Sequence, residues 1–124
     1  EHVLEPLSGY MLLAKKMWEN PTEYCEGWNF GPEAESVLTV WEVATAIIGN
    51  FGFGELNDVS DPNALHEANL LMLNINKAKS RLGWAPRLNA NQTAVLTADW
   101  YKRYKTENVY DLCIEEINSF LKNS

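Results

Sequence analysis

Cysteine, positive charge and long apolar runs are scarce in this sequence of 124 residues. The two cysteines, Cys25 and Cys113, lie far apart and outside any CxxC or Cys/His spacing. We therefore expect reduced, partly buried thiols in place of a disulfide or metal ligands. Ten basic against seventeen acidic residues give a net charge of −7. A chain of this charge repels a phosphate backbone, so nucleic acid is not an expected partner.

No apolar run approaches the roughly 18 residues that a membrane-spanning helix needs. The first six residues, EHVLEP, contain no basic region of the kind that begins a secretory signal. We expect a cytoplasmic protein with no membrane partner. With 46% hydrophobic residues, the chain has enough apolar surface for one domain, and residues 1–124 are predicted to form it.

Helical periodicity and end signals predict the first helix over residues 6–19. Asn20 and Pro21 prevent its continuation. The residues expected on its buried face are those that recur at helical spacing: Leu4, Leu7, Met11, Ala14 and Trp18.

Capping signals predict further helices along the chain. Thr39 begins a helix that stops near Gly49, and Asn89 begins a long one that runs to about residue 105, because each has Glu or Gln three positions later. A short helix is predicted between Asn76, as its N-cap, and Gly83, as its left-handed C-terminal residue. A last helix is predicted over residues 114–122.

Short apolar runs between turn-forming residues predict a few strands. Residues 27–32 are interpreted as a buried strand, residues 55–59 as a weak one and residues 68–73 as another, with loop over most of residues 49–68. The predicted fold class is therefore α+β, mainly helical with a few short strands.

Two motifs resemble sites of dinucleotide-dependent enzymes but lack the required context. GNFGFG, residues 49–54, follows a predicted helix and is not followed by a helix N-terminus that could receive a pyrophosphate. Tyr101 and Lys105 have the Y-x-x-x-K spacing that lets an ammonium lower a phenol pKa. Tyr101 is placed on the apolar side of its helix, however, so we interpret it as a core residue.

His66 and Glu67 are the candidate binding residues of the sequence. They lie together in the polar loop DPNALHEA, residues 61–68, just before a predicted strand, and loops at strand ends often carry binding groups. A surface His-Glu pair is also ordinary, and neither His2 nor His66 has metal-ligand spacing. No self-contained catalytic constellation is found in the chain.

A family resemblance extends over nearly the whole chain. LNINKAKSRLGWAP, residues 73–86, resembles the L-D-x-S-K-A…L-G-W-x-P signature in the C-terminal region of extended short-chain dehydrogenase/reductases that act on nucleotide sugars. DWYK, residues 99–102, resembles the helix that follows, and WNFGP, residues 28–32, resembles the family's Y-N-I-G strand. HVLEPLSGY, residues 2–10, and HEA, residues 66–68, resemble the dehydratase subgroup whose substrate is CDP-glucose. Asn74 and Asn76 replace the usual aspartate and serine, and asparagine caps a helix about as well as either.

The resemblance implies a substrate-binding C-terminal lobe whose NAD(P)-binding Rossmann core is missing from these residues. In the family, NAD and the catalytic residues belong to the N-terminal Rossmann domain, so no catalytic residue and no bound cofactor are expected for this chain alone. NAD takes a hydride from C4 of the hexose, water is lost across C5 and C6, and the hydride returns to C6. His66 and Glu67 are expected near the nucleotide-diphosphate end of the substrate.

Two alternatives remain open. The chain could be the C-terminal part of another nucleotide-sugar epimerase or dehydratase, or a non-catalytic protein-interaction module on the same fold. The first predicted helix and the strand at residues 27–32 would normally pack against the missing domain, so we expect the isolated chain to self-associate.

Overall fold

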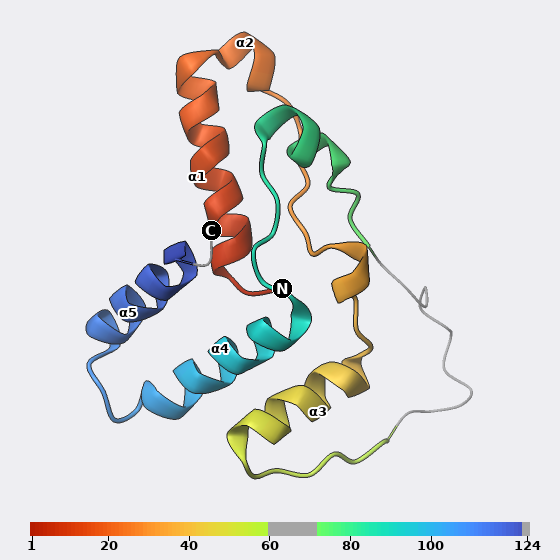
Figure 1. Cartoon of the computed structure of the whole chain (residues 1–124), viewed down its shortest axis with the longest axis vertical. Coiled ribbons are helices and arrows are strands. Elements are labelled where there is room, and N and C mark those ends of the chain that lie inside the picture. The colour runs from red at the N-terminus through yellow and green to blue at the C-terminus, as the bar shows by residue number, and fades with distance from the viewer. Residues whose placement is uncertain (60–71, 123–124) are drawn as a thin grey trace.

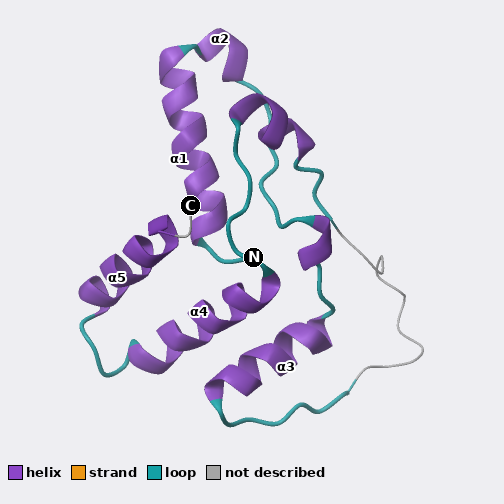
Figure 2. Ribbon diagram, in the orientation of Figure 1, coloured by secondary structure: helices purple, strands orange, loops and turns teal. Residues whose placement is uncertain are grey.

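The computed structural model describes residues 1–59 and 72–122. All of the regular secondary structure in these ranges is helical (Figures 1 and 2). The prediction of a mainly helical chain is confirmed, but no strand occurs among the described residues. The elements in order are α1 (Leu4–Glu19), α2 (Pro21–Tyr24), η1 (Ala34–Ser36), α3 (Val40–Phe51), η2 (Ala78–Leu82), α4 (Ala90–Arg103) and α5 (Val109–Lys122).

The strands predicted at residues 27–32 and 55–59 are wrong. A strand needs a neighbouring backbone to satisfy its N–H and C=O groups, and the segment at residues 27–32 is bonded by side chains instead. Lys77 Nζ donates to the carbonyl of Gly27 at 2.8 Å, and Asn29 Nδ2 donates to the carbonyl of Asn74 at 3.4 Å. The strand predicted at residues 68–73 falls mostly outside the described residues, and residues 72 and 73 are loop.

The first helix has the predicted C-terminal end but buries a different face. Glu5 and Gly9 are buried, and Leu12 packs partly against the core, whereas Met11 and Trp18 are 75% and 91% exposed. A Cβ atom built on Gly9 would lie 2.3 Å from Cδ1 of Phe30. The absence of a side chain at position 9 therefore lets the Phe30 ring approach this face, which no local periodicity could indicate.

Aromatic packing joins α1, the loop at residues 27–33 and η2 into the main core. The rings of Phe30 and Trp84 meet edge to face with their centroids 4.9 Å apart. Trp84 Nε1 donates a hydrogen bond to Ser8 Oγ on α1 at 2.9 Å, which satisfies the indole N–H inside the core. The buried members of this core are Tyr24, Phe30, Ile75, Ala78, Leu82 and Trp84.

The short helix near residue 80 forms as predicted, with one correction at its N-terminus. Gly83 ends it in the left-handed region, with φ of 71°. Residues 76 and 77 are already helical ahead of η2, and the Oδ1 atom of Asn74 accepts from the backbone N–H of Asn76 at 2.9 Å. Asn76 itself is inside the turn. Asn74 and Asn76 are both asparagines, so residue type alone does not show which of the two caps the helix.

The capping boxes at the starts of α3 and α4 are confirmed. Thr39 and Glu42 exchange the two hydrogen bonds of the box, as do Asn89 and Gln92. Helix α3 continues past the predicted stop to Phe51 and is closed by Gly52 with φ of 83°.

Helices α3, α4 and α5 follow one another in the lower part of the view (Figure 1), where α3 packs against α4. Helix α5 begins at Val109, five residues earlier than predicted, because Asn108 Oδ1 accepts from the N–H groups of Tyr110 and Asp111 at 3.0 and 3.3 Å. Helix α4 ends at Arg103, two residues before the predicted position. No helix within residues 1–59 and 72–122 is both long and apolar enough to cross a bilayer.

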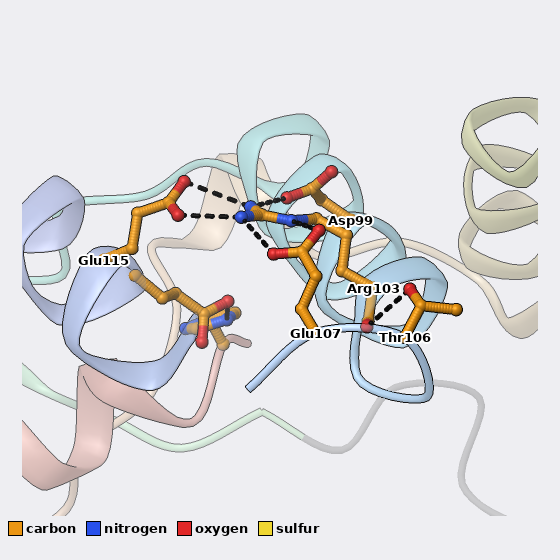
Figure 3. Close-up of polar contacts among 7 residues, drawn as sticks. Asp99, Arg103, Thr106, Glu107 and Glu115 are labelled. Carbon is orange, nitrogen blue, oxygen red and sulfur yellow. Dashed lines mark hydrogen bonds and ion pairs between the residues drawn. The ribbon is translucent and has the colours of Figure 1, made fainter. Parts of the chain in front are cut away.

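Arg103 holds the turn that connects α4 and α5 (Figure 3). Its guanidinium contacts Asp99 at 3.0 Å, Glu107 at 2.8 Å and Glu115 at 2.7 Å. These carboxylates raise the pKa of Arg103, and the guanidinium lowers the pKa values of Glu107 and Glu115 through hydrogen bonds and charge attraction. The turn is therefore closed by charge-assisted hydrogen bonds.

Candidate functional site

A cleft of about 550 Å³ is lined by α3, α4, the N-terminal residues and the segments at residues 31–38, 72–73 and 86–88. The capping boxes and the packing of the two helices fix its walls. Most of its lining is apolar, and Glu1 and Glu5 are the charged side chains among its described lining residues. Apolar walls with a few polar groups are the usual composition of a ligand site. The larger apolar lining residues include Pro32, Val37, Leu38, Val43, Ile47, Met72, Leu73, Pro86 and Leu88.

Glu5 holds the loop that leads into α4. It lies in the first turn of α1, where the helix N-terminus favours a negative charge. Its Oε1 atom accepts hydrogen bonds from the backbone N–H groups of Arg87 at 2.8 Å and Leu88 at 2.7 Å. Glu5 is only 1% exposed, and its Oε2 atom is buried with no hydrogen-bond partner.

A second cleft of about 460 Å³ lies between the N-terminal residues, the end of α4 and α5. His2, which is 4% exposed, places Nε2 3.3 Å from Oε1 of Glu116. Its Nδ1 atom accepts the backbone N–H of Leu4 at 3.4 Å. Trp100 and Tyr101 also line this cleft.

The two clefts meet at Glu1 and Thr97, which line both. Burial is the main cause that raises the pKa of Glu1; the N-terminal ammonium opposes this rise and the negative charge of Glu5 adds to it. The acidic residues Glu5, Glu1 and Glu116 therefore line the joined clefts.

The predicted binding residues His66 and Glu67 lie outside the described residues, so their prediction stays untested. Both cysteines are free, as predicted, but Cys25 is exposed and not partly buried. Tyr101 is 54% exposed, so its interpretation as a core residue is wrong. The ammonium of Lys105 lies 5.7 Å from the ring centroid of Tyr104.

The described residues do not fit a dinucleotide cofactor at the glycine-rich motif. Gly52 closes the C-terminus of α3, and residues 53–59 contain no helix that could present N–H groups to a pyrophosphate. Within the described ranges, no group of three or more histidine, cysteine or acidic residues is placed to hold a metal ion.

Sequence reasoning missed Glu5, His2 and Glu116 as members of the clefts. A signal for Glu5 exists: it lies four residues before Gly9, on the same side of a helix. Had Gly9 been identified as the contact point of a neighbouring ring, Glu5 would have been expected to face the interior. No comparable signal links His2 to Glu116, which lie at opposite ends of the chain.

Comparisons with known proteins find a similarity that extends over nearly the whole chain. No family model matches it. Over 122 residues the chain is 33% identical to CDP-glucose 4,6-dehydratase of Salmonella typhimurium. The match covers 98% of this chain and 34% of that protein. The chain spans about a third of the length of this relative and matches a C-terminal part of it, which confirms the resemblance found in the motifs.

Proposed function

From the similarity to a C-terminal part of CDP-glucose 4,6-dehydratase, we propose that this chain is the nucleotide-sugar-binding lobe of an enzyme of that kind. The observation that carries the proposal is the 33% identity along 98% of the chain. The parent enzyme converts CDP-glucose to CDP-4-keto-6-deoxyglucose in the cytoplasm. NAD, bound to a separate N-terminal lobe, accepts and returns the hydride. Residues 1–124 act as one domain that binds the substrate and does not turn it over alone.

The exposed apolar surface supports the requirement for a second lobe. Met11 and Trp18 on α1 are 75% and 91% exposed, and Val40 at the start of α3 is 88% exposed. Surface of this kind is typical of faces that a partner covers. Without its N-terminal lobe, the chain is expected to self-associate through these faces.

Turnover by a chimera tests whether substrate binding and catalysis belong to different lobes. In the chimera, this chain replaces the matching C-terminal third of the Salmonella relative. We expect the chimera to convert CDP-glucose in the presence of NAD and the purified 124-residue chain to give no product. Product formed by the purified chain alone would overturn the proposal.

Titration of the same chimera tests His66 and Glu67, which we propose to lie near the nucleotide-diphosphate end of the substrate. His66→Ala and Glu67→Gln are each expected to weaken CDP-glucose binding. Thr22→Ala, at an exposed position on α2, is the matched control and should leave it unchanged. Unchanged affinity in both loop variants would remove this loop from the site.

Competition among CDP-glucose, UDP-glucose and dTDP-glucose separates the proposal from another nucleotide-sugar epimerase or dehydratase. Preference for CDP-glucose supports the assignment, and preference for another base contradicts it. Sedimentation tests the alternative of a non-catalytic module, which the exposed apolar faces also allow. A strict monomer would favour that module.

A further inference from the structure

We draw no further inference here: the strongest candidate, the apolar face of α5 on which Tyr110, Ile114 and Ile117 are exposed, carries no proposal because nothing in the described part of the structure shows what covers it.

Discussion

The part of the molecule built from α1, the loop at residues 27–33 and η2 differs from the part built from α3, α4 and α5 in how it uses apolar side chains. In the first, Phe30 and Trp84 are 6% and 4% exposed and pack on each other. In the second, α3 has no buried residue, and Trp41 is 55% exposed. The first part is held by an aromatic core. In the second, α4 and α5 bury only Ala94, Ala98, Leu112 and Phe120, and helix caps, the packing of α3 on α4 and the Arg103 ion pairs add to this burial.

The comparison indicates that one part of the chain mainly stabilises the fold and that the other mainly presents accessible surface. Burial of apolar surface is the main source of folding free energy, and the core around Phe30 buries six residues packed together. The open part leaves α3 and the clefts accessible. Such a division suits a lobe that folds around one core and presents its other side to a partner or ligand.

The largest effect is expected from removing the Phe30 ring. Phe30→Ala should lower the free energy of unfolding by about 3–5 kcal/mol, because it leaves a cavity between Trp84 and α1. The matched change in the open part, Trp41→Ala, should cost within about 0.5 kcal/mol. Urea denaturation followed by circular dichroism measures both. Similar losses in the two variants would remove the distinction between the parts.

The next effect concerns the close approach of Phe30 to α1. Gly9→Ala should destabilise the chain by about 1–3 kcal/mol, because the new Cβ would overlap the ring and force a shift. Gly27→Ala is the control, since nothing lies within 4 Å of a Cβ built at that position. Thermal unfolding compares them. A neutral Gly9→Ala would mean that the ring does not pack on this face.

A smaller effect is expected from the cap of α3. Thr39→Ala should cost about 1 kcal/mol, because it removes the hydroxyl that accepts from the N–H of Glu42. Thr39→Ser keeps that hydroxyl and should recover most of the loss. The measurement is the midpoint of urea unfolding, with helix content from circular dichroism. Equal stability of the alanine and serine variants would show that the cap does not hold this helix.

The smallest effect concerns pH and the turn between α4 and α5. Arg103 lowers the pKa values of Glu107 and Glu115 in the folded state. Their contribution to stability is therefore present above the unfolded glutamate pKa of about 4.3, and it is lost as the pH falls through the lowered folded values. Melting temperature measured at a series of pH values should fall below this point in the wild type.

Arg103→Gln removes the cause of these shifts and should flatten that decline. Because the three carboxylates are largely solvent-exposed, the change in melting temperature should be small and should shrink further in high salt. Lys15→Gln, on an exposed pair of α1, is the matched loss of one positive charge. An unchanged acid profile in Arg103→Gln would remove the turn from the pH dependence.

Local signals predicted much of the helical structure and little of the site. The pairs Thr39/Glu42 and Asn89/Gln92 located two helix starts because each box involves residues three positions apart. The same local reasoning failed at residues 27–32, where apolar composition suggested a strand. A strand depends on a backbone partner from elsewhere in the chain, and composition carries no information on whether one exists.

The sequence by itself determined the capping boxes of α3 and α4, the C-terminal end of α1 and the similarity to a C-terminal part of a nucleotide-sugar dehydratase. Only the tertiary structure decided which face of α1 is buried. It also decided that Glu5 accepts hydrogen bonds from the backbone N–H groups of Arg87 and Leu88, which are more than 80 positions away in the sequence. The physical reason is the separation in sequence between the residues that interact. A cap forms between near neighbours, whereas burial and the fate of a buried carboxylate depend on which distant segments fold against each other.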